Sequence, residues 1–132
     1  MKKILPILFV LLTTSSLQSF AQMSCTSLLT DEYISDGQYY STTISATDTK
    51  ECDITLTAGN EYRIIVCAQQ LSRINFQVID TQNNILFNNK KYNYTNYWNF
   101  HIKETFNGKI KLQLVDNNVE TDEIILLIGY KK

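Results

Sequence analysis

The side chains in this sequence with the strongest intrinsic chemistry are three cysteines and one histidine. Cys25, Cys52 and Cys67 are potential nucleophiles, but a catalytic thiolate needs an activating base beside it. His101 falls on the polar face of a different predicted strand. Scattered cysteines and a single histidine also lack the ligand spacing of a zinc site. The sequence therefore predicts neither a thiol enzyme nor a metal centre.

The other polar residues form no recognised catalytic motif. A glycine-rich phosphate loop and a nucleophile-elbow sequence are both missing from the chain. The acidic pairs Asp31–Glu32 and Asp122–Glu123 are sequence neighbours, so each pair diverges on a strand or lies in a loop, unlike the facing carboxylates of a glycosidase. Residues 116–123 are rich in oxygen ligands, but their spacing does not fit an EF-hand calcium loop. We expect no catalytic centre, no metal and no cofactor.

Disulfide formation is the other chemistry open to the cysteines, because exported domains permit it. Cys52 and Cys67 lie near the two strands that are predicted on either side of a loop at 58–60. In the predicted pairing of these strands the side chain of Cys52 points inward and that of Cys67 points outward. These two cysteines therefore pair only after a one-residue shift or a bulge. Cys25 can instead fold back onto Cys67. Three alternatives stay open: Cys67 with Cys52, Cys67 with Cys25, or three reduced thiols with Cys52 packed as a small apolar side chain.

Residues 88–99, NNKKYNYTNYWN, combine four aromatic side chains with asparagine and lysine. Aromatic rings with amide neighbours can stack on sugars or anchor a protein partner. Trp98 is in phase with Phe100 and Ile102, which assigns it to the core, and some of the tyrosines could simply edge a strand. The predicted contact surface is residues 88–97. Its candidate side chains are Lys90, Lys91, Tyr92, Asn93, Tyr94, Asn96 and Tyr97.

The first 21 residues have the layout of a secretory signal peptide. Two lysines precede a short apolar core at 4–12, and Ser19-Phe20-Ala21 places small residues where signal peptidase recognises them. The apolar core is too short to span a bilayer, which takes about 20 residues. We expect cleavage after Ala21 and export to the periplasm or the exterior. Cys25 lacks the upstream leucine of a lipidated cysteine, which argues against a lipid anchor.

Removal of 21 residues from 132 leaves 111, which is one ordinary domain. The 12 basic residues fall to 10 against 13 acidic ones, a net charge near −3. This balance is not that of a nucleic-acid binder. The longest remaining apolar run, 124–128, is typical of a buried strand and not of a transmembrane segment. Residues 22–37 are assigned to an N-terminal segment and residues 38–132 to the folded domain.

Alternation of apolar and polar residues, punctuated by turn residues, predicts an all-β domain. A helical turn capped by Ser24 is expected only within residues 24–32. About eight strands that each offer two or three inward apolar side chains favour two facing antiparallel sheets, a sandwich of jelly-roll type. The last strand is expected to be central or buried on both faces. The predicted strands are 38–47, 54–57, 62–66, 74–79, 85–87, 98–103, 109–114 and 124–130.

Three turns organise the predicted strands. A loop at 58–60 is expected to form a hairpin in which Leu56 lies opposite Tyr62, so that apolar residues face each other on one side of the sheet. The polar residues 80–84 predict a second hairpin. Residues 105–108 predict a further turn, because they contain Asn107 and Gly108.

Several of these segments resemble motifs of prepeptidase C-terminal-type and related jelly-roll domains. Residues 55–64, TLTAGNEYRI, are similar to an l-x-A-G-x-x-Y-x-i turn, and residues 79–86 to a v-D-x-x-g-x-x-l hairpin. Trp98-x-Phe100 followed by Ile110-x-Leu112 resembles a third strand pair, although Ile110 replaces the usual aromatic residue. The likeness covers roughly residues 50–130. It implies a domain that binds, stabilises or escorts a partner, although fold does not fix function.

Together these observations predict an exported, non-catalytic binding module of the bacterial envelope or exterior. Its predicted partner is a glycan or an envelope protein, bound at residues 88–97. The alternative is a structural accessory subunit of an envelope or secretion assembly, whose partner contacts the sheet edges.

Overall fold

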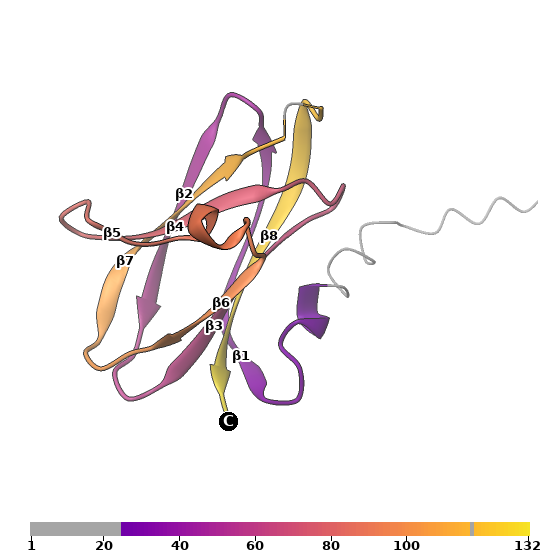
Figure 1. Ribbon diagram of the computed structural model, residues 1–132. Helices are drawn as coiled ribbons and strands as arrows, with labels where there is room; N and C mark the ends of the chain where they lie inside the picture. Colours follow the sequence, from indigo (N-terminus) through magenta and orange to yellow (C-terminus); the bar gives the residue numbers. More distant parts are fainter. Residues whose placement is uncertain (1–24, 117) are drawn as a thin grey trace, which may run out of the picture.

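The computed structural model describes residues 25–116 and 118–132, so the predicted signal peptide and its cleavage site lie outside the described residues. The described residues form eight strands, one 3-10 helix and a helical turn at 25–27 (Figure 1). The elements are β1 (Tyr33–Ser45), β2 (Thr49–Leu56), β3 (Glu61–Ala68), β4 (Ile74–Asp80), β5 (Ile85–Asn88), η1 (Asn89–Tyr92), β6 (Tyr97–His101), β7 (Phe106–Leu114) and β8 (Thr121–Lys131).

The strands form two four-stranded sheets, and all pairings between them are antiparallel. The first sheet has the order β1-β8-β3-β6 and the second has the order β2-β7-β4-β5. The chain changes sheet at every connection except β4–β5, which gives the winding of a jelly roll. The prediction of an all-β antiparallel sandwich is confirmed. The predicted helical turn is present at 25–27, and Ser24 lies outside the described residues.

The predicted hairpin around residues 58–60 is wrong. Leu56 pairs with Phe106 of β7 in the second sheet, whereas Tyr62 pairs with Phe100 and Tyr130 in the first. The chain turns at Gly59, where φ is +88°, and passes from one sheet to the other. Two strands that each have one apolar face can bury those faces side by side in one sheet or across the core. Alternation alone therefore does not distinguish a hairpin from a corner between sheets.

The predicted turn at 105–108 is also displaced, because β7 already begins at Phe106. Gly108 lies inside β7, opposite Ile54 and Asp80 on the two neighbouring strands. A Cβ atom at this position would collide with the Ile79 carbonyl oxygen and the Phe106 ring. Gly108 therefore permits a close approach between strands and does not form a turn.

The hairpin around residues 80–84 is confirmed, and it joins β4 to β5. The Asp80 carboxylate accepts hydrogen bonds from the backbone N–H groups of Gln82 and Asn84, at 2.9 and 2.8 Å. Asn83 supplies the left-handed conformation that closes the turn, with φ of +64°. The side chain of one aspartate thus fixes the register of this hairpin.

The main core lies between the two sheets, and a second, smaller cluster lies on the outer face of the first sheet. In the second cluster Ile65 of β3 and Leu127 of β8 pack against Cys25 and the helical turn that covers them, which lies beside β1 and β8 in Figure 1. The central position of β8, and its burial on both faces, are as predicted. Within the described residues, no helix has the length and apolar character needed to cross a bilayer.

Candidate functional site

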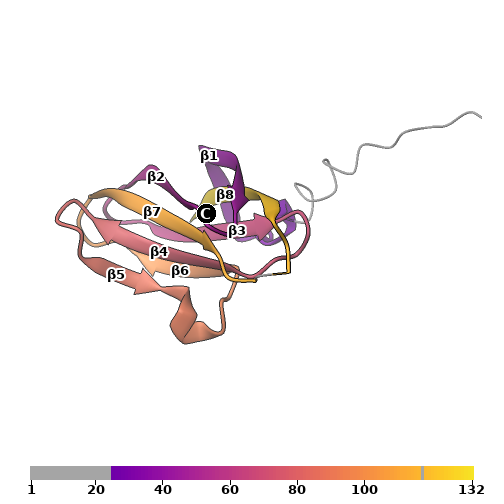
Figure 2. The same cartoon turned by 90° about the horizontal axis from the view of Figure 1, so that it is seen from above.

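Residues 88–97, which we call the arch, carry the chain from β5 in the second sheet to β6 in the first. The arch contains η1 and projects away from the sandwich beside β5 and β6 (Figure 2). The Asn88 side chain caps η1 by accepting a hydrogen bond from the Lys90 backbone N–H at 3.0 Å. Asn93 and Tyr94 follow in the left-handed conformation, each with φ of +54°, and reverse the chain direction.

Asn89 fixes the base of the arch to β4. Its side chain is fully buried and uses its whole hydrogen-bonding capacity. Oδ1 accepts from the Asn75 side-chain amide and from the Phe76 backbone N–H, both at 2.9 Å. Nδ2 donates to the backbone carbonyl oxygens of Ile74 at 2.8 Å and Thr95 at 3.0 Å. One side chain therefore joins both ends of the arch to the sheet.

Tyr92 is the aromatic side chain that the arch presents most openly. Its ring stacks on Phe87, with centroids 5.6 Å apart, and lies against Trp98, with centroids 4.2 Å apart. Trp98 is partly buried and packs on the main core, as predicted. Tyr92 still keeps 47% of its surface exposed. It is therefore held in place on one side and accessible on the other.

Tyr94 and Tyr97 lie against two different arginines. The Arg73 guanidinium lies 5.6 Å from the Tyr94 ring centroid, and the Arg63 guanidinium lies 4.7 Å from that of Tyr97. Hydrogen bonds from the Arg73 backbone N–H and guanidinium hold the pKa of Asp116 below its usual value. The three tyrosines of the predicted surface therefore diverge and do not form one aromatic patch. The remaining candidates, all exposed, are Lys90, Lys91, Asn93 and Asn96.

Two grooves meet at the arch. The first, of about 370 Å³, lies on the outer face of the second sheet, and we call it the amide groove because Asn75, Gln77 and Gln113 line it. The second, of about 300 Å³, includes residues 71–74. Tyr94 lines both grooves and so forms the wall between them. The other residues that line the amide groove are Ala46, Thr47, Asp48, Asn88, Lys90, Leu114 and Val115.

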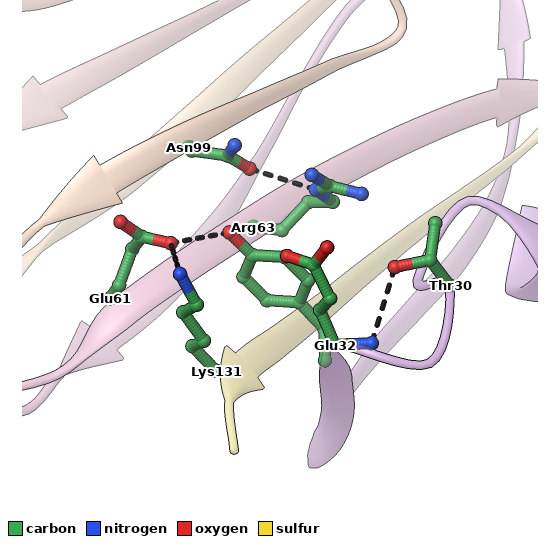
Figure 3. Close-up of polar contacts among 7 residues, drawn as sticks. Thr30, Glu32, Glu61, Arg63, Asn99 and Lys131 are labelled. Atoms are coloured by element: carbon green, nitrogen blue, oxygen red, sulfur yellow. Dashed lines mark hydrogen bonds and ion pairs between the residues drawn. The ribbon is translucent and has the colours of Figure 1, made fainter.

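A polar cluster around Arg63 joins the N-terminal segment to the outer face of the first sheet (Figure 3). Arg63 donates to the Asn99 side chain and to the Leu28 carbonyl oxygen, both at 2.8 Å, and lies 4.2 Å from the Tyr33 ring centroid. The Tyr33 hydroxyl donates to the Glu61 carboxylate at 2.5 Å. Burial and this bond raise the pKa of Tyr33 to about 12, and the same bond lowers the pKa of Glu61.

The structure contains the disulfide Cys25–Cys67, one of the pairings that the sequence leaves open. Cys52 is a buried free thiol on the inner face of β2. Burial raises the pKa of this thiol to about 11, so it is protonated near neutral pH. His101 is exposed at the end of β6. In residues 25–116 and 118–132, no three histidine, cysteine or acidic side chains come together as a metal site.

The oxygen-rich loop at 116–123 uses two of its carboxylates internally. Asp116 forms an ion pair with Arg73 at 3.0 Å. Asp122 is almost fully buried and accepts from the Gln70 backbone N–H at 3.0 Å. These carboxylates hold the loops at this end of the sandwich together.

Sequence reasoning missed Asn89 and the amides of the groove. Asn75, Gln77 and Gln113 occupy the polar positions of two predicted strands, so their outward direction was predictable. Their gathering was not, because it depends on β4 and β7 being neighbours in one sheet. Asn89 shows no sequence signal apart from its place in an asparagine-rich stretch.

The fold and the site together define an antiparallel jelly-roll sandwich with a projecting arch between two grooves. No family model matches this chain, and no curated protein sequence matches it. Its structure is similar to the crystal structure of Aeromonas hydrophila PliG, a periplasmic lysozyme inhibitor of g-type lysozyme. The TM-score is 0.55 at 13% sequence identity, over 71% of this chain and 85% of that chain. A likeness at this identity shows the shared fold. The resemblance to prepeptidase C-terminal-type domains stays a prediction.

Proposed function

We propose that this chain is an exported, non-catalytic binding module of the bacterial envelope or exterior that holds a protein partner through the arch. The observation that carries this proposal is the buried Asn89 side chain, whose four hydrogen bonds set the shape of the arch before any partner arrives. A surface that is ordered in advance loses less conformational entropy on binding.

The chemistry of the arch tip suits a concave protein surface. Lys91, Tyr92 and Asn93, which we call the arch tip, are all exposed. Tyrosine is a frequent anchor residue at protein interfaces, because it buries a large ring and keeps a polar hydroxyl. Lys90 and Lys91 give this end of a mildly acidic chain a local positive charge, which favours approach to an acidic partner.

The likeness to PliG gives modest support to this proposal. PliG is described as a periplasmic inhibitor of a lysozyme, so the same framework is used there by an exported protein that acts on another protein. A shared fold does not show that two proteins bind the same partner. In this chain the arch is therefore the feature that supports a protein partner.

The Cys25–Cys67 disulfide supports export, because such bonds persist in oxidising compartments. It also bears on membrane attachment. A sulfur atom bonded to another sulfur is not available for a thioether to lipid, so the disulfide supports a free N-terminal segment. The protonated state of the buried Cys52 thiol agrees with a structural role for that residue.

The test is capture of a partner by the immobilised protein and by the double variant K91A/Y92A. The matched control is Y39A/K103A, because Tyr39 is 50% exposed and Lys103 is also exposed, both away from the arch. A purified g-type lysozyme and an envelope extract of the native host are the two sources of partner. We expect the arch variant to lose a specific partner by tenfold or more in affinity, and the control to keep it. Equal binding by both variants, with both folded, would contradict the proposal.

A second candidate function is that of a structural accessory subunit. Ile85 and Leu86 favour it, because they are 57% and 58% exposed on β5, an edge strand of the second sheet. An open edge with apolar side chains is a template for another chain. The variant I85K/L86K would then lose a stoichiometric complex that K91A/Y92A retains.

A further inference from the structure

We infer that the amide groove is a binding site for a neutral oligosaccharide, separate from the arch tip. Its floor is a group of primary amides on the outer face of the second sheet. Asn75 of β4 pairs with Gln113 of β7, and Gln77 of β4 pairs with Asn88 of β5. A primary amide carries donors and acceptors without net charge, so the amide groups that are not used within the floor match the hydroxyl groups of a sugar.

Hydrogen bonds among these amides orient the floor. Asn75 Nδ2 donates to the side-chain oxygens of Asn88 at 2.8 Å and of Asn89 at 2.9 Å. Gln77 Nε2 donates to Asn75 Oδ1 at 3.3 Å. The network is thereby tied to the buried asparagine under the arch. A site that is ordered in this way binds with a smaller entropy cost.

Acceptor capacity remains at the surface of the floor. Gln113 Nε2 donates to the Thr49 hydroxyl at 3.1 Å, which fixes that side chain. Among the described residues, no donor forms a hydrogen bond to Gln77 Oε1 or Gln113 Oε1. Two adjacent strands thus offer fixed amide oxygens to hydroxyl donors of a ligand.

The walls of the groove select for a neutral, polar ligand. Lys90 on one side and Asp48 on the other are the two lysine, arginine or acidic side chains that line it, one of each sign. A phosphate or nucleic-acid site would instead need an excess of positive charge. Apolar small-molecule sites are lined mostly by hydrophobic side chains. Here the apolar lining is confined to Ala46, Leu114 and Val115.

Tyr94 provides an aromatic wall next to the amides. Its backbone N–H donates to the Asn89 carbonyl oxygen at 3.0 Å, which positions the backbone of this residue, and the Arg73 guanidinium lies 5.6 Å from its ring centroid. An aromatic ring beside polar groups suits a sugar, which has both apolar C–H faces and hydroxyl edges. The volume of about 370 Å³ falls within the range of roughly 300–1,000 Å³ found for small-molecule sites.

A peptide is a poorer occupant of this groove. Extended peptides bind by adding a strand to an exposed sheet edge. The two glutamines of the floor lie on β4 and β7, which are the two central strands of the second sheet, so the backbone groups of these strands already pair with neighbours. A ligand in this groove can therefore be bound by the side-chain amides on the face of the sheet and not by the backbone of these strands.

The experiment titrates ¹⁵N-labelled protein with four neutral tetrasaccharides, of glucose in α-1,4 and β-1,4 linkage, of mannose, and of N-acetylglucosamine. The readout in the wild type is the side-chain amide resonances of Gln77 and Gln113, and affinities of the variants are taken from the backbone amide resonances of the groove residues. We expect at least one tetrasaccharide to shift both, and Q77A/Q113A to lose at least tenfold in affinity through the missing hydrogen bonds. Gln82→Ala is the matched control, because Gln82 is exposed at the distant β4–β5 turn.

Further variants separate this inference from the proposed function. Q113M keeps a similar side-chain length and removes the amide oxygen that would accept from a ligand hydroxyl, so it is expected to weaken sugar binding even if the double variant does not fold. K91A/Y92A should bind sugar as the wild type does, whatever its effect on protein capture. Absence of a shift at the groove glutamines with all four sugars at millimolar concentration overturns the inference. Wild-type affinity in folded Q77A/Q113A or Q113M also overturns it.

Discussion

At the scale of single residues, Asn89 connects the fold to the site. Its buried side-chain amide donates a hydrogen bond to the Thr95 carbonyl oxygen of the arch. The same amide forms hydrogen bonds with the backbone of β4 in the sheet. It also contacts Asn75, the first amide of the groove. A single side chain therefore determines the shape of the arch and the orientation of the groove floor.

Replacement of Asn89 by alanine should destabilise the protein strongly. The change leaves two buried donors and at least one buried carbonyl without partners, and each such group costs roughly 1–3 kcal/mol. We expect a loss of about 3 kcal/mol in the free energy of unfolding, measured by urea denaturation. Asn96→Ala is the matched control and should change it by less than about 0.5 kcal/mol, because Asn96 is exposed. Similar losses in the two variants would refute the role given to Asn89.

The bond between Tyr33 and Glu61 should make stability depend on pH at both extremes. Because the folded-state pKa of Glu61 is lowered, its contribution is present above its ordinary pKa of about 4.3 and is lost as the pH falls further. Because the pKa of Tyr33 is raised to about 12, its contribution is present below about pH 10 and is lost as the pH rises through about 12.

Tyr33→Phe removes the tyrosine effect and the largest cause of the glutamate effect, while the Lys131–Glu61 ion pair remains. Urea midpoints measured from pH 3 to 7 and from pH 9 to 12 should vary less in this variant than in the wild type. Tyr39→Phe serves as the control, because Tyr39 is an exposed tyrosine of the same strand. An unchanged pH profile in Tyr33→Phe would show that the hydrogen bond does not contribute.

At the scale of elements, the positions of the strands were predictable and their partners were only partly so. The β4–β5 hairpin follows from the local chemistry of Asp80 and its turn. The corner at Gly59 and the start of β7 at Phe106 depend on which sheet each strand joins. That choice is made by packing across the core, and alternation along one strand carries no information about it. The arch was predictable as a surface segment because its polar and aromatic residues are contiguous in the sequence. The amide groove was not predictable, because it depends on which strands are neighbours.

The disulfide between the helical turn at 25–27 and β3 should contribute to the stability of the protein. Cys25 and Cys67 are 42 residues apart, and closing a loop of this size stabilises the folded state by about 4 kcal/mol in the chain-entropy model. We expect C25S/C67S to lose stability of that order. Dithiothreitol should lower the unfolding midpoint of the wild type and leave that of the variant unchanged. A reductant effect of equal size in both proteins would rule out this disulfide as the cause.

At the scale of the whole molecule, the jelly roll brings the two proposed binding surfaces to one region. The arch joins the two sheets, and the amide groove lies on the outer face of the second sheet, with Lys90 and Tyr94 belonging to both. A protein at the arch tip and a sugar in the groove would therefore be neighbours. Their binding should be coupled, either by contact or through the shared hydrogen bonds of Asn89.

The N-terminal segment gives the last prediction, because its state decides whether the module is tethered or free. We expect the protein from its native host to begin at Gln22 and to carry no lipid, with an intact mass two hydrogens below that of the reduced chain. Alkylation after unfolding without reductant should label Cys52 alone, since it is the free cysteine of the described residues. The variant C52A, unlabelled under the same conditions, is the control. A mass increase located on Cys25, or labelling of three cysteines, would contradict the disulfide-bonded, unanchored form, because the Cys25 sulfur cannot be bonded to Cys67 and to a lipid at once.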